Sequence, residues 1–149
     1  MIPAERVPFP QLGVPEMDQT HEEFVKHITS VEMAADIEVL PRLNELMSHT
    51  EAHFSQETRW MESLNFPQMG CHSVEHEGVL AVMREAKRYV EEGKFEVGRV
   101  LARELGEWFR SHAATMDAML AYAMRNGAPG ECGSGACEMH PSQELSEQI

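Results

Sequence analysis

The sequence predicts an all-α protein: an up-down-up-down four-helix bundle with an extended N-terminal arm and a flexible C-terminal tail. Apolar residues recur at helical spacing in four long segments, and short turn-forming stretches separate these segments. No segment of strand length alternates apolar and polar residues. The chain has 149 residues, which is enough for one domain with a proper core. We place the bundle at residues 1–126 and the tail at residues 127–149.

The first two helices follow from proline positions and one apolar stripe. Residues 1–16 contain four prolines, so this segment is expected to be an extended arm rather than a helix. Asp18 is a plausible N-cap for the first helix, which runs to the mid-thirties. Its apolar stripe comprises Phe24, Val25, Ile28 and Val31. The second helix begins near Pro41, a residue suited to a first helical turn, and ends at the turn formed by residues 65–67.

The last two helices are bounded by glycine and proline. The third runs over residues 68–93, since glycine commonly follows the last residue of a helix. The fourth spans roughly residues 96–126, and Gly127 and Pro129 end it. The residues beyond are rich in glycine, proline, serine and glutamate, which is typical of a flexible tail.

Charge and cysteine content narrow the function. The formal charge of −13 argues against nucleic acid or an anionic membrane surface as a partner. We find neither a secretory signal nor an apolar run long enough for membrane insertion. Three cysteines do not form a disulfide framework, so we expect Cys71 to be a free thiol and the protein to be cytoplasmic. Cys132, Cys137 and His140 are interpreted as tail residues without a fixed role, with a metal or redox site as the alternative.

Eight histidines are more than an exposed surface needs, so some of them are candidate metal ligands. Four candidate ligands occur in pairs. His53 and Glu57 are four residues apart, as are His72 and His76. Residues at that spacing share one face of a helix, so each pair can hold a metal ion from one side. The turn at residues 65–67 folds the two pairs toward each other.

The fourth helix contributes a less regular pair. Asp117 follows His112 by five residues, a spacing that does not share a clean face of an ideal α-helix. Either both side chains reach one site from the flanks of the buried stripe, or a π-bulge realigns them. The complete set of candidate ligands is His21, His53, Glu57, His72, His76, His112 and Asp117. Five imidazoles and two carboxylates exceed one tetrahedral zinc site and suit two metal ions bridged by carboxylates, with ferrous iron favoured.

Four segments resemble the hemerythrin family, in particular its short bacteriohemerythrins: MDQTHEEF, HFSQETRWM, CHSVEH and WFRSHAATMD. The resemblance covers roughly residues 12–122. It implies a cofactor of two non-haem iron ions (Fe2+/Fe3+) with an oxo or hydroxo bridge. By that resemblance, one iron is held by His72, His76 and His112. The other is held by His21 and His53, and both are bridged by Glu57 and Asp117.

The resemblance also implies a function, which is reversible dioxygen binding at the iron that has two histidines. Its purpose would be storage, sensing, or delivery to an oxidase or monooxygenase. A di-iron enzyme that reduces peroxide or nitric oxide is the alternative, because it would use the same ligands. Four aromatic side chains are expected to surround the open position and exclude water from it: Phe24, Phe54, Trp108 and Phe109. Each would also serve as an ordinary core residue.

His49 departs from the family pattern, which more often has a tyrosine at this position. It lies four residues before His53, on the ligand-bearing face of the second helix. A hydrogen bond to a neighbouring backbone group or carboxylate is the simpler interpretation. The alternative is a role near the metal site in autoxidation or proton access.

Overall fold

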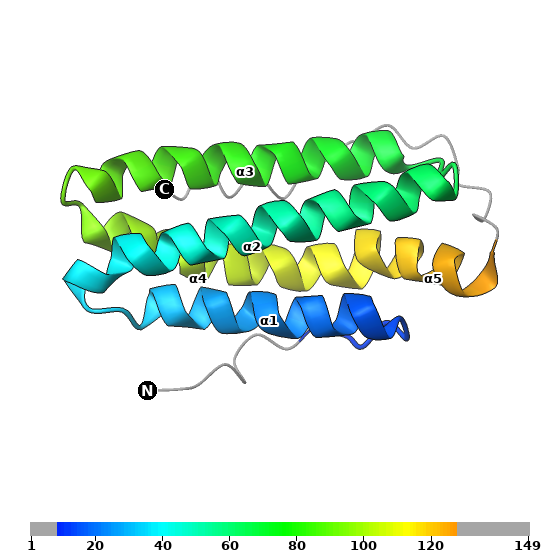
Figure 1. Cartoon of the computed structure of the whole chain (residues 1–149), viewed down its shortest axis with the longest axis horizontal. Coiled ribbons are helices and arrows are strands. Elements are labelled where there is room, and N and C mark those ends of the chain that lie inside the picture. Colours follow the sequence, from blue (N-terminus) through cyan, green and yellow to red (C-terminus); the bar gives the residue numbers. More distant parts are fainter. Residues whose placement is uncertain (1–8, 128–149) are drawn as a thin grey trace.

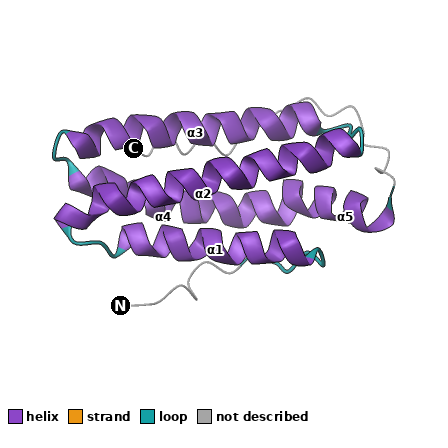
Figure 2. Cartoon of the chain, in the orientation of Figure 1, coloured by secondary structure: helices purple, strands orange, loops and turns teal. Residues whose placement is uncertain are grey.

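The computed structural model describes residues 9–127, which form an all-α bundle of parallel and antiparallel rods (Figure 1). Its elements are α1 (Pro15–Glu32), α2 (Asp36–Ser63), α3 (Met69–Glu91), α4 (Phe95–His112), the π-helical segment η2 (Ala113–Asp117) and α5 (Ala118–Asn126). Helices α1 and α3 each pack against both α2 and α4. Short loops join consecutive helices, and α5 continues the line of α4 (Figure 2). The predicted up-down-up-down bundle is confirmed.

The first helix begins at Pro15 rather than at the predicted Asp18. Asp18 lies inside the first turn, where its carboxylate accepts hydrogen bonds from the backbone N–H groups of Leu12 (2.8 Å) and Gly13 (3.1 Å). These bonds hold residues 9–14, the described part of the predicted arm, in a non-helical path against the bundle. A carboxylate in the first turn is also favoured by the positive end of the helix dipole.

The second helix also begins earlier than predicted, at Asp36, so Pro41 lies inside it. Proline has no N–H to donate to the carbonyl of Ile37, one turn back. Ile37 is 85% exposed, so water can satisfy that carbonyl and the helix tolerates the proline. The turn after α2 lies where the sequence places it, and Asn65 adopts the positive φ of 47° that asparagine accepts more readily than most residues.

The predicted fourth helix is interrupted by η2, where one extra residue widens the helical turn. Of the two arrangements that the sequence left open for His112 and Asp117, the structure shows the π-bulge. Helix α5 then ends as predicted at Gly127, whose φ is 71° and whose N–H donates to the carbonyl of Ala123 at 2.8 Å.

Two apolar clusters form the core, and the candidate ligands separate them. Along α1, Met17 belongs to the smaller cluster and Phe24 to the larger one, while His21 lies between them in sequence. Glu57 has the same position in α2, between Phe54 and Met61. Polar side chains in the middle of an apolar core carry a large desolvation cost unless something compensates them.

Three further expectations from the sequence concern membrane insertion, Cys71 and the C-terminal tail. None of the described helices is both long and apolar enough to cross a membrane. Cys71 is half-buried in α3 and disulfide-bonded, so the prediction of a free thiol is wrong and one reason to expect a reducing compartment is removed. The predictions for Cys132, Cys137 and His140 lie outside the described residues.

Candidate metal centre

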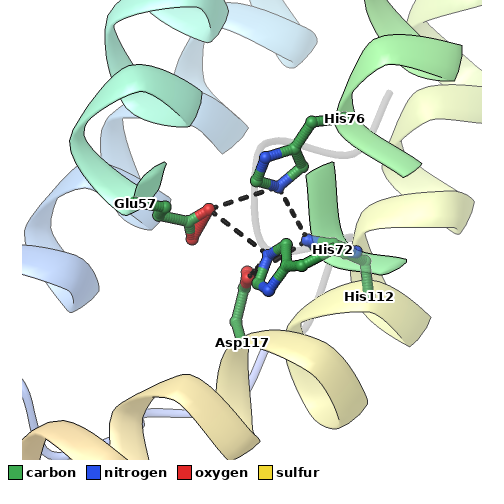
Figure 3. A group of neighbouring side chains, drawn as sticks. All are labelled: Glu57, His72, His76, His112 and Asp117. Atoms are coloured by element: carbon green, nitrogen blue, oxygen red, sulfur yellow. Dashed lines mark hydrogen bonds and ion pairs between the residues drawn. The ribbon is translucent and has the colours of Figure 1, made fainter. Parts of the chain in front are cut away.

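The seven candidate ligands lie together in one layer across the bundle, and helices α1 to α4 and η2 all contribute to it. None of these side chains belongs to a residue more than 4% exposed. Figure 3 shows five of them pointing toward a common point from α2, α3, α4 and η2. The complete layer consists of His21, His53, Glu57, His72, His76, His112 and Asp117.

The ligand atoms divide into two groups, and within each group they lie within 4.8 Å of one another. The larger group has three histidines and two carboxylates: His72, His76, His112, Glu57 and Asp117. The smaller group has two histidines and the same two carboxylates: His21, His53, Glu57 and Asp117. The carboxylates therefore belong to both groups, and the histidines are divided three to two.

Glu57 directs one oxygen to each group. Its Oε1 lies 3.4 Å from Nε2 of His53, in the smaller group. Its Oε2 lies 3.3 Å from Nε2 of His76, in the larger group. A carboxylate that offers its two oxygens to two different sets of imidazoles is arranged to bridge a pair of cations.

Asp117 has the same arrangement because η2 aligns it with His112. Its Oδ1 lies 3.1 Å from Nε2 of both His112 and His72, in the larger group. Its Oδ2 lies 3.1 Å from Nε2 of His21, in the smaller group. In a regular α-helix, a five-residue spacing would rotate Asp117 about 140° from His112. The π-bulge is therefore what makes Asp117 available to both groups.

The charges of this layer are strongly coupled. Burial raises the pKa of Glu57, but the neighbouring His53 and His21 outweigh it and hold that pKa well below its usual range. Burial lowers the pKa of His21 and His112, yet the Asp117 carboxylate beside them leaves these values at about 9 and about 10. In the metal-free protein, protonated imidazoles thus balance the buried carboxylates. Divalent cations would supply the same positive charge.

The donor set fits metal ions better than it fits a hydrogen-bonded network. Both ring nitrogens of His21, His53 and His72, and both oxygens of Glu57 and Asp117, lack a hydrogen-bond partner among the described residues. Several approach one another to 3.1 Å, but none of those contacts has hydrogen-bond geometry. Leaving a buried polar atom unsatisfied costs about 1–3 kcal/mol. Imidazole nitrogens with carboxylate oxygens and no thiolate suit iron or a similar divalent transition metal.

Two of the four predicted aromatic rings cover the smaller group. Phe24 lies with its ring centroid 5.4 Å from that of His53, and Phe109 lies 4.9 Å from His21. Phe9, in the arm, packs 5.8 Å from Phe109 and 6.2 Å from His21. Sequence reasoning did not single out Phe9, because nothing in a proline-rich segment indicates where it crosses the bundle.

The other two predicted rings lie against the larger group. Phe54 stacks on His76 with centroids 3.7 Å apart and an interplanar angle of 1°. Trp108 stacks on His112 at 4.5 Å and 22°. Phe54 also lies with its ring centroid 5.2 Å from that of His53, in the smaller group, so the four rings together contact both groups of ligands.

Glu75 is a buried side chain at the site that sequence reasoning missed. It is 1% exposed, and its Oε1 accepts hydrogen bonds from Nε1 of Trp108 (2.9 Å) and Nδ1 of His112 (3.2 Å). An acceptor at Nδ1 fixes the tautomer that leaves Nε2 of His112 available for a metal ion. The one signal in the sequence was its position three residues after His72, on a neighbouring part of the ligand face.

Replacing Glu75 by glutamine is expected to weaken metal binding by about 10–100-fold. The amide keeps the shape but loses the negative charge that makes His112 a stronger donor. Competition with a chelator of known affinity measures this change. Trp108→Phe is the matched control, because it removes the other hydrogen bond to Glu75 but keeps a ring beside His112, and its effect should be smaller. Equal affinities for wild type and Glu75→Gln would contradict the assigned role.

Comparisons with known proteins identify the family that the chain resembles. Residues 12–123 match the hemerythrin HHE cation-binding domain. A bacteriohemerythrin from Ralstonia nicotianae is 36% identical over 118 residues, which cover 79% of this chain and 86% of that protein. A bacteriohemerythrin from Aquifex aeolicus is 31% identical over 111 residues, or 70% of this chain and 85% of that protein. No solved structure matches the chain significantly.

Proposed function

The chain belongs to the hemerythrin family, and we propose that it binds dioxygen reversibly at two non-haem iron ions held by the seven buried side chains. The observation that carries this proposal is the unequal division of the histidines around two shared carboxylates. A symmetric set would give both ions the same number of protein ligands. The three-to-two division leaves one ion with a position that protein atoms do not fill.

The ligand count supports an open position at the smaller group. An ion in the larger group would be held by three imidazoles and two carboxylate oxygens. An ion in the smaller group would have two imidazoles and the same bridges, which leaves it one ligand short. Ferrous iron, when bound, supplies the electrons and the open position that dioxygen requires.

The surroundings of the smaller group support binding rather than turnover. Phe24 and Phe109 cover His53 and His21, and Phe9 covers Phe109 from outside. These rings keep water from the side of the smaller group that they cover, and exclusion of water slows the irreversible oxidation of a reduced iron site. Peroxide or nitric oxide reduction would need a proton donor beside the open position. The buried acid that the structure adds, Glu75, lies with the larger group instead.

Iron analysis and anaerobic titration test the proposal. We expect about two iron ions per chain in the reduced protein, one for each group of ligands. Addition of dioxygen should then give a coloured adduct that bleaches under vacuum and returns over repeated cycles, with the metal-free protein as the control. A single iron per chain, or prompt irreversible oxidation with turnover of peroxide or nitric oxide, would refute dioxygen carriage. Storage, delivery to an oxidase or monooxygenase, sensing, and a cytoplasmic location stay predictions.

A further inference from the structure

Residues 9–14 of the N-terminal arm cross the ligand layer where α1 and α4 pack together. Leu12 is buried in the smaller apolar cluster, whereas Phe9, three residues earlier, packs against the larger one. Because the candidate ligands separate the two clusters, the arm spans the layer between these contacts. The ring centroid of Phe9 is 6.2 Å from that of His21 in α1 and 5.8 Å from that of Phe109 in α4.

Phe9 is the outer of two rings that cover His21, a candidate ligand of the smaller group. Phe109 lies edge-on to His21, with ring centroids 4.9 Å apart, and is completely buried. Phe9 also lies edge-on to His21 but is only half-buried. The outer ring on this side therefore comes from a non-helical segment rather than from a helix of the bundle. Such a segment opens locally at a lower free-energy cost than a packed helix does.

Two polar side chains attach the arm to the helices. The Asp18 carboxylate in α1 accepts hydrogen bonds from the N–H groups of Leu12 (2.8 Å) and Gly13 (3.1 Å). The Arg125 guanidinium in α5 donates to the carbonyl of Leu12. Gly13 has a positive φ of 79°, and a Cβ atom there would lie 3.2 Å from Cδ of Arg125. The arm is thus attached at residues 12 and 13, and its ring contacts place Phe9 against the ligand layer.

We propose that the arm seals the open position of the smaller group, with Phe9 as the covering ring and Asp18 as the attachment that keeps it in place. Small molecules then pass this side of the smaller group when the arm opens, so the arm controls their rates of entry and exit. The inference rests on the open position of the proposed function but not on dioxygen chemistry. It explains why an aromatic residue of a proline-rich segment lies directly against the ring of a candidate ligand.

Binding of a small anion to the Co2+-loaded protein tests this role without dioxygen. Co2+ accepts the same ligand types as Fe2+, and its visible absorption reports the binding of azide in a stopped-flow experiment. Phe9→Ala should raise the association and dissociation rate constants of azide about tenfold, since opening of the wild-type arm breaks the ring contacts of Phe9. The Kd should equal that of the wild type, because a seal slows entry and exit by the same factor.

Further variants separate the seal from the stability of the bundle. Asp18→Ala removes the attachment but keeps the Phe9 ring, so it should also accelerate both steps and leave the Kd unchanged. Phe9→Leu keeps an apolar cover and should restore most of the wild-type behaviour. Two matched controls should keep the wild-type rates. Glu16→Ala changes an exposed acidic residue in the same first turn of α1, and Phe95→Ala removes a half-buried ring of the larger cluster at the start of α4.

The other outcomes overturn the proposal. If Phe9→Ala binds azide at the wild-type rates, the arm is not a seal, and access is through the pocket of about 310 Å³ that His53 lines between α1 and α2. If the Kd of Phe9→Ala rises, Phe9 supports the ligands rather than closing a path. A wild-type protein that holds Co2+ but binds no azide has no open position, which refutes this inference and the proposed function together. The expected azide rates in a protein whose ferrous form does not bind dioxygen would refute the proposed function alone.

Discussion

Replacing Glu57 by glutamine is expected to lower the iron content of the purified protein from about two ions per chain to about one or less. Glu57 directs Oε1 to His53 at 3.4 Å and Oε2 to His76 at 3.3 Å. Glutamine keeps one oxygen but replaces the other by an amide nitrogen, which does not bind a cation. The bridge is therefore lost even if one group of ligands still holds its ion.

The same substitution should also destabilise the metal-free protein. Glu57 is fully buried and helps to hold the pKa of His21 at about 9. Removing one partner of a buried charge pair costs about 3–5 kcal/mol, because the other charge is left uncompensated. Metal analysis and urea denaturation measure the two effects. Glu51→Gln, an exposed substitution in the same helix, should change neither, and a Glu57→Gln protein that retains both ions would contradict the bridging arrangement.

Much of the fold and the clustering of the candidate ligands could be predicted from the sequence because they depend on local spacing. Residues four apart share a helix face whatever the rest of the chain does, so His53 with Glu57 and His72 with His76 were expected to lie in pairs. The structure brings both pairs together with the other three candidates. That these side chains hold iron stays a prediction.

The features that could not be predicted depend on neighbours distant in sequence or on solvent. A glutamate in an acidic chain is usually exposed, and the hydrogen bonds from Trp108 and His112, both distant in sequence, help to explain why Glu75 is buried. Pro41 was placed in a first turn because its effect inside a helix depends on the exposure of Ile37, one turn earlier. The sequence left the π-bulge as one of two arrangements for His112 and Asp117, because residue spacing does not determine which backbone hydrogen bonds of a helix are lost.

The π-bulge leads to the second large prediction, in which insertion and deletion at the same exposed residue, Ala114, have opposite outcomes. One alanine inserted after Ala114 places Asp117 six residues beyond His112, and beyond the π-bulge that extra residue rotates Asp117 about 100° away from the ligand layer. The same rotation turns Leu120 away from the smaller apolar cluster. We expect the insertion variant to hold about one iron or none and to denature at a lower temperature than the wild type.

Deleting Ala114 should instead preserve the site. The deletion leaves Asp117 four residues beyond His112, and that spacing shares one face of a regular α-helix. Helix α5 then keeps its orientation, so Leu120 stays in the core and Asp117 still reaches both groups of histidines. Metal analysis and thermal denaturation measure the iron content and the denaturation temperature of the two variants. If the deletion loses iron as completely as the insertion, the π-bulge sets more than the alignment of these two ligands, and the explanation given for it is wrong.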